Sequence, residues 1–122
     1  MKTIIGAYSL FRKGKRLDSF LKSGKVLCQT MSKSPYMLYY KNSEIPTLLD
    51  IKDVGEQIKL DIIEIDDEKV QAWCKKYNLK EGLIKTCDSK YQKVCTYFSK
   101  DKDLSLSILS QGMRSEWRKK II

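Results

Sequence analysis

The segment from Gln57 to Tyr77 constrains the fold more than any other part of the sequence. Its first part, 57–65, alternates apolar and polar residues as far as Ile62, which is the period of a β-strand. The part that follows carries four apolar residues at the spacing i, i+3, i+4 and i+7: Val70, Trp73, Cys74 and Tyr77. That spacing is the period of an amphipathic helix, and Asp66 and Asp67 are expected to cap it. A strand that leads into such a helix predicts a domain in which a sheet packs against helices.

The rest of the chain adds more strands than helices. Strands are predicted at 2–8, 25–31, 36–40 and 46–49, and a hairpin is predicted from 83–87 and 91–98. A short helix is predicted at 17–21, closed by Gly24 in the left-handed conformation, and Gly82 is predicted to end the longer helix. The expected fold class is α+β: a small mixed β-barrel or curled sheet with two or three helices packed outside.

Size and hydropathy indicate one domain. The chain has 122 residues, and we expect a domain at 1–102 and a basic, apolar C-terminal tail at 103–122 packed on it. No apolar run is long enough to span a membrane. The apolar stretch 3–11 is followed by a basic cluster where a signal peptide would have its cleavage site. We therefore expect a cytoplasmic protein that does not bind membranes.

The cysteine and histidine content limits the chemistry. There are four cysteines and no histidine. No two cysteines have the Cys-x-x-Cys spacing, so we expect buried, reduced thiols and no metal or other cofactor. Without histidine, any proton transfer must fall to Glu, Asp, Lys, Tyr or Cys.

The chain is strongly basic, with a net charge of +9. Such an excess attracts nucleic acid, anionic membranes or acidic partners. Only four of the 24 basic residues are arginine, and lysine has AT-rich codons, so genome composition is a rival source of the charge. The candidate surface for an acidic protein or nucleic acid comprises Arg12, Lys13, Lys15, Arg16, Arg114, Arg118, Lys119 and Lys120.

Several short motifs occur in an order that resembles the γ-glutamylcyclotransferase-like superfamily, which includes the avirulence-induced-gene proteins of plants and small bacterial and phage members. These motifs are Ala7-Tyr8-Ser9-Leu10, Phe11-Arg12-Lys13-Gly14, Tyr36-Met37-Leu38-Tyr39, Ile45-Pro46-Thr47-Leu48 and, after Gly55, the strand 60–66. A hairpin that ends near Tyr97 completes the pattern. The resemblance covers residues 2–98 and depends on the shared order and spacing of the motifs.

The resemblance implies a pocket for a glutamyl substrate. In the family, backbone N–H groups of the loop after the first strand hold the substrate carboxylate. A glutamate at the end of the helix moves the proton of the substrate amine as that amine attacks the γ-carbonyl, and 5-oxoproline leaves. On this pattern the substrate-binding residues would be Tyr8, Ser9, Leu10 and Tyr97.

The sequence departs from the family at both catalytic elements. Tyr8 replaces the loop glycine, which would allow close backbone approach or an unusual φ. A gap-free alignment puts Tyr77 where the family has its glutamate, and tyrosine is a poor base at neutral pH. The nearby Glu81 is the alternative acid/base, although that alignment needs extra residues in the helix.

Three functions stay open. The first is a binding protein for a small anionic, γ-glutamyl-like ligand or a partner, with lost or altered catalysis. A lysine-rich protein of this kind, rich in residues with AT-rich codons, would be typical of a phage or mobile element, where it could have a host-interaction role. The second is an active γ-glutamyl cyclotransferase that uses Glu81, and the third is a basic nucleic-acid-binding protein.

Overall fold

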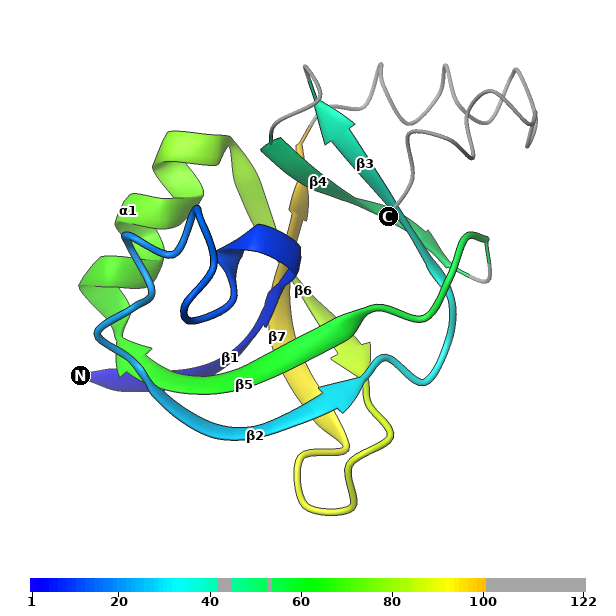
Figure 1. The fold of residues 1–122 in the computed structure, drawn as a ribbon, viewed down its shortest axis with the longest axis horizontal. Helices are drawn as coiled ribbons and strands as arrows, with labels where there is room; N and C mark the ends of the chain where they lie inside the picture. Colours follow the sequence, from blue (N-terminus) through cyan, green and yellow to red (C-terminus); the bar gives the residue numbers. More distant parts are fainter. Residues whose placement is uncertain (42–44, 53, 101–122) are drawn as a thin grey trace.

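A computed structural model describes residues 1–41, 45–52 and 54–100 (Figure 1). The predicted tail, 103–122, and its four basic candidates Arg114, Arg118, Lys119 and Lys120 lie outside the described residues. The elements in chain order are β1 (Lys2–Tyr8), the 3-10 helix η1 (Ser9–Phe11), β2 (Lys25–Met31), β3 (Tyr36–Lys41), β4 (Ile45–Lys52), β5 (Lys59–Asp66), α1 (Asp67–Tyr77), β6 (Leu79–Lys85) and β7 (Lys93–Ser99).

Five strands form one mixed sheet in the order β2-β5-β1-β7-β6. β1 lies in the middle, antiparallel to β5 and parallel to β7, with Ile5 opposite both Ile63 and Cys95. β1 and β5 are interior strands with a neighbour along each edge, and Ile5 and Ile63 are completely buried. The remaining strands, β3 and β4, pair only with each other.

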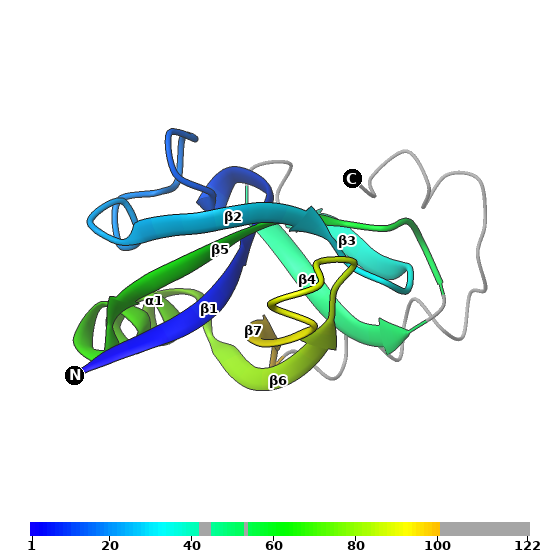
Figure 2. The ribbon, with the colours of Figure 1, turned by 90° about the horizontal axis from the view of Figure 1, so that it is seen from below.

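The sheet is curled rather than closed into a barrel (Figure 2). Its two edge strands approach each other at one end, where Ser32 and Thr86 form an isolated bridge. Two backbone hydrogen bonds flank this bridge: Lys33 N–H donates to Lys85 O at 2.8 Å, and Cys87 N–H donates to Met31 O at 3.0 Å. A β-bulge between Val26 and Cys28 increases the bend of β2. The predicted α+β class with a curled sheet is confirmed.

Helix α1 and the β3–β4 pair lie at opposite ends of the described molecule (Figures 1 and 2). The apolar stripe of α1 packs inward, with Trp73 completely buried. Strand β4 packs against β7 and η1, so the loop after β1 lies between the sheet and the β3–β4 pair. In the described part of the chain, no helix is long and apolar enough to cross a membrane.

Two local predictions are wrong. Residues 17–21 form turns instead of a helix, because hydrogen bonds such as Leu21 N–H to Asp18 O close single turns. Gly24 has no positive φ. It is needed because a Cβ there would collide with Ile63 Cγ2 and would lie 3.1 Å from Ile65 Cβ. The predicted N-cap is confirmed at Asp66, although its side chain makes no capping hydrogen bond, and Asp67 lies in the first turn of α1.

The end of α1 is also displaced from its predicted position. The helix ends at Tyr77, and Asn78 adopts the left-handed conformation at φ 55°, ψ 59°, with its N–H bonded to Cys74 O. Asparagine adopts this conformation more readily than most residues. Gly82, predicted to end the helix, lies inside β6, where it leaves room for the Phe98 ring. The hairpin therefore begins at Leu79 rather than Leu83.

Candidate functional site

The loop after β1 is tightly constrained. Tyr8 has an ordinary extended backbone at φ −127°, so this position does not require the family's glycine. The left-handed residue is Ser9, at φ 53°. Its hydroxyl lies 2.6 Å from the Tyr40 hydroxyl on β3, and its carbonyl accepts a 3.3 Å hydrogen bond from Arg12 Nε. Strand β3 and the basic turn thus fix the conformation of Ser9.

A pocket of about 350 Å³ opens beside this loop. Two of its predicted residues, Ser9 and Leu10, come from η1, while Leu38 and Tyr40 come from β3. Its basic residues are Arg12, Lys15 and Lys59, and the other residues that line it are Met31, Gln57 and Ile58. No acidic side chain is among the described residues that line it. The pocket therefore combines an apolar floor with a positive rim, which suits a ligand that has one anionic group.

The buried carboxylate of Asp61 anchors the basic turn. Asp61 on β5 is only 1% exposed. Its Oδ2 accepts a hydrogen bond from the Lys13 backbone N–H at 3.1 Å, and its Oδ1 accepts one from Gln29 Nε2, also at 3.1 Å. Gly14 at φ 85° allows the turn, and its N–H donates to Asp18 Oδ2 at 2.8 Å. Asp61 thus fixes the backbone between Arg12 and Lys15, the two basic residues of this turn that line the pocket.

The predicted basic turn divides into two parts. Arg12 and Lys15 line the pocket. Lys13 and Arg16 are exposed and are not among the lining residues. The Lys13 ammonium donates to Gly24 O at 3.3 Å, which ties the turn to the start of β2. Lys13 therefore stabilises the turn through both its backbone and its side chain.

The end of α1 meets the loop after β1, as the resemblance implies, but aromatic rings fill the meeting point. The Tyr77 ring packs on Phe11 with centroids 4.9 Å apart. Phe11, Tyr8 and Tyr97 all lie within 5.2–6.1 Å of the Trp73 ring. We call these five residues, Tyr8, Phe11, Trp73, Tyr77 and Tyr97, the aromatic cluster. Tyr77 therefore contributes a ring contact, not a carboxylate, at this meeting point.

Two hydroxyl groups of the aromatic cluster are held in their neutral form. The buried Tyr8 hydroxyl donates to the Tyr97 carbonyl at 2.7 Å. Burial raises the pKa of Tyr8 far above its usual value. Burial also raises the pKa of Tyr97, and the nearby Cys74 and Glu81 add to the effect. Neither phenol can accept a proton near neutral pH, so both act as hydrogen-bonding and packing groups.

Glu81 lies on β6, not at the end of the helix. It pairs with Tyr97 across the β6–β7 ladder and is exposed. Its Oε1 accepts a hydrogen bond from Cys95 Sγ at 3.1 Å. Burial, and then this bond, raise the pKa of the Cys95 thiol. Glu81 does not line the pocket beside Ser9, so it does not share this pocket with the predicted loop residues Ser9 and Leu10.

The thiols only partly match their predicted burial. Cys28, Cys74 and Cys95 are half-buried, Cys87 is exposed, and all four are free. Among the described residues, no group of three or more Cys, Asp and Glu side chains is arranged to hold a metal ion.

Sequence reasoning missed three residues of the site: Tyr40, Lys59 and Asp61 as an anchor. The sequence pattern places Tyr40 only in an aromatic-rich strand, and it places Lys59 only at a polar position of an alternating strand. A polar residue buried in an apolar strand, as Asp61 is, is a signal that could have identified the anchor.

Comparisons with known proteins identify the fold. No protein-family model matches the sequence, and no curated protein matches it significantly. Three solved structures are similar in fold. PH0828 from Pyrococcus horikoshii has a TM-score of 0.62 and 23% identity over 82% of this chain and 80% of its own. The uropathogenic E. coli protein c4763 has a TM-score of 0.70 and 16% identity over 98% and 91%. An AIG2-like protein from Mus musculus has a TM-score of 0.67 and 11% identity over 95% and 82%.

This chain has the γ-glutamylcyclotransferase-like fold. Sequence identities of this size show the shared fold alone. What the pocket binds must therefore be argued from this chain's own residues.

Proposed function

We propose that this γ-glutamylcyclotransferase-like protein binds a small ligand with an anionic group, γ-glutamyl-like in size, and does not catalyse cyclotransfer. The main support is the pocket beside Ser9 and Leu10, with three basic side chains around an apolar floor. Its volume of about 350 Å³ lies in the range of small-molecule sites.

Arg12 is the strongest candidate to hold the anion. Its Nε is fixed by the Ser9 carbonyl, and no described residue accepts a hydrogen bond from its terminal guanidinium nitrogens. Two parallel N–H groups match a carboxylate, and the existing bond to Ser9 reduces the conformational freedom lost on binding. Lys15 and Lys59 would add positive charge at the rim.

The paired hydroxyls of Ser9 and Tyr40 offer one further donor. In a hydroxyl–hydroxyl hydrogen bond one oxygen accepts, and that oxygen keeps its own proton available. Both residues line the pocket. The available proton can therefore donate to a ligand oxygen without breaking the bond that shapes the loop.

The proposed loss of catalysis rests on the end of α1. Tyr77, which a gap-free alignment puts at the family's glutamate position, packs on Phe11. Glu81, the alternative base, bonds to Cys95 on another part of the sheet. A general base must reach the proton it removes, directly or through one water, and no described carboxylate lines the pocket.

Calorimetric titration with γ-glutamyl dipeptides and their neutral diamides tests this proposal. Arg12→Gln is expected to weaken binding of the acidic ligand roughly tenfold, about 1.4 kcal/mol, and Lys59→Gln several-fold. Lys69→Gln on α1 removes the same charge from an exposed site away from the pocket and should bind normally. Equal affinity for charged and neutral ligands would contradict the proposal.

The same compounds provide the catalytic test. We expect no 5-oxoproline from the wild-type protein. Release that Glu81→Gln abolishes would instead establish the active cyclotransferase.

A further inference from the structure

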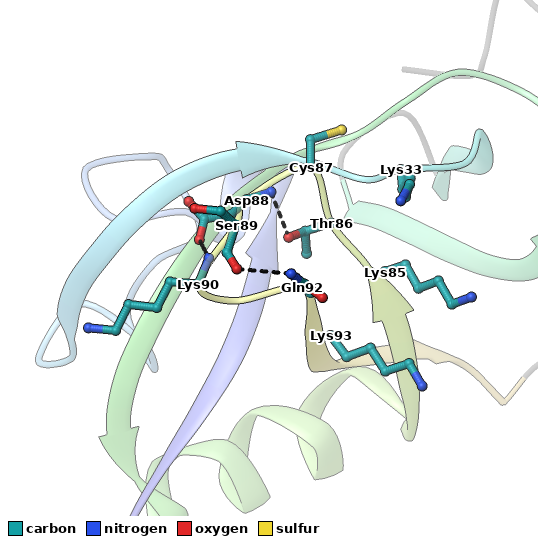
Figure 3. A pocket seen from close by; sticks show the side chains of 9 residues that line it. All are labelled: Lys33, Lys85, Thr86, Cys87, Asp88, Ser89, Lys90, Gln92 and Lys93. Atoms are coloured by element: carbon teal, nitrogen blue, oxygen red, sulfur yellow. Dashed lines mark hydrogen bonds between the residues drawn. The ribbon is translucent and has the colours of Figure 1, made fainter.

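A second basic surface lies on the hairpin loop between β6 and β7 (Figure 3). Four lysines line an open hollow of about 1010 Å³: Lys33, Lys85, Lys90 and Lys93. We call this surface the lysine hollow. None of its residues lines the pocket beside Ser9, and none belongs to the basic surface predicted from sequence.

The fold holds three of these lysines close together. Lys85 and Lys93 are direct partners in the β6–β7 ladder. Lys33 reaches the same strand end because its backbone N–H donates to Lys85 O at 2.8 Å. Like charges placed directly opposite each other on a sheet are unfavourable. Figure 3 shows the Lys85 and Lys93 side chains extending to the same side of the hairpin.

The charge of the lysine hollow is poorly offset. None of its four lysines forms an ion pair with a described acidic residue. Asp88 is the one acid among the described residues that line it. Its Oδ2 is occupied by the backbone N–H groups of Lys90 and Tyr91, both at 2.8 Å. Asp88 thus shapes the turn, and its single charge leaves the lysine hollow strongly positive.

We propose that the lysine hollow binds the phosphate backbone of duplex nucleic acid without sequence preference. Lysine is a compact charge that contacts phosphates, whereas base edges are read mainly by forked groups such as arginine. Ser89 and Gln92 add neutral polar groups of the kind that also contact phosphates.

The absence of aromatic residues from the described lining disfavours two other partners. Protein interface cores are enriched in aromatic residues and depleted in lysine. Single strands stack their bases on aromatic rings. The ring next to the hollow, Tyr91, has the Lys90 ammonium 5.4 Å above its centroid, which leaves that face unavailable to a base.

Fluorescence anisotropy with a labelled DNA duplex, measured from 50 to 200 mM salt, tests the proposal. Roughly four phosphate contacts give a slope of log K on log salt near −3.6, and an affinity loss of about 150-fold over this range. Lys85→Gln with Lys93→Gln should reduce the slope to about −1.8 and the loss to roughly 12-fold. These exposed substitutions remove charge repulsion, so thermal unfolding should show that the fold is retained.

The matched control is Lys69→Gln with Lys76→Gln, which removes the same charge from the exposed face of α1. This control should leave the slope within about 0.3 of wild type. Equal effects of the two double variants would overturn the proposal, because they would show attraction by net charge alone. Absence of duplex binding, or tighter binding of a single strand of equal length, would also overturn it.

Discussion

Removing the Asp61 carboxylate should loosen the basic turn and destabilise the whole domain. Asp61→Ala leaves two donors without their acceptor. Gln29 is exposed and can turn its amide to water, so losing its hydrogen bond to Asp61 should cost little stability. The Lys13 backbone N–H is part of the turn and has no other acceptor among the described residues. A hydrogen bond to a charged group contributes about 1.5–3 kcal/mol, so we expect a loss of about 2–3 kcal/mol in the free energy of unfolding.

Urea unfolding at pH 7 measures this loss, and thermal unfolding should show a decrease in Tm of roughly 10 °C. Asp61→Asn is the matched control. Its remaining oxygen can accept from Lys13, and its new amide can donate to a turned Gln29, so the loss should be about 1 kcal/mol or less. Ligand affinity should fall in the alanine variant because Arg12 and Lys15 lose their fixed backbone. If Asp61→Ala loses less than about 1 kcal/mol, the anchoring role is wrong.

Three further changes test other parts of the structure. Tyr8→Phe removes the donor to the buried Tyr97 carbonyl and should lower the unfolding free energy by about 1–2 kcal/mol in urea; an unchanged midpoint would argue against that bond. Gly24→Ala forces a methyl group against Ile63 Cγ2 and should cost about 1–3 kcal/mol, whereas Gly14→Ala, in open space, should cost only the strain of its positive φ. Burial raises the pKa of Cys74 from 9.0 to about 11, so between pH 9 and 11 the folded state binds more protons than the unfolded state, and the unfolding free energy should fall as the pH rises. Cys74→Ala should reduce this dependence of the unfolding free energy on pH. An identical pH dependence in the variant would refute the raised pKa of Cys74.

Much of the fold could be predicted because the periodic signals were strong. Strands β1 and β2 have the predicted bounds, and the apolar stripe that ends at Tyr77 matches α1. The end of the helix was misplaced because Gly82 looked like a stop signal, while Asn78, the residue that ends it, is a weaker one. The segment 17–21 had helical spacing but too few residues to sustain a helix without tertiary support.

The candidate site could be predicted only in part. Ser9, Leu10, Arg12 and Lys15 are close in sequence, and a resemblance to known motifs could identify them. Tyr40 reaches the pocket through the packing of the β3–β4 pair on η1, and Lys59 reaches it through the pairing of β5 with β2. No local pattern encodes either contact. The same holds for the lysine hollow, where Lys33 meets Lys85 only because the edge strands bond at one end of the sheet.

A crystal structure of the protein with a γ-glutamyl dipeptide tests the central claim most directly. The account predicts an intact ligand beside Ser9 and Leu10, with a carboxylate within hydrogen-bond distance of the Arg12 guanidinium. A ligand against Glu81 and Tyr97, or 5-oxoproline in place of the dipeptide, would contradict it.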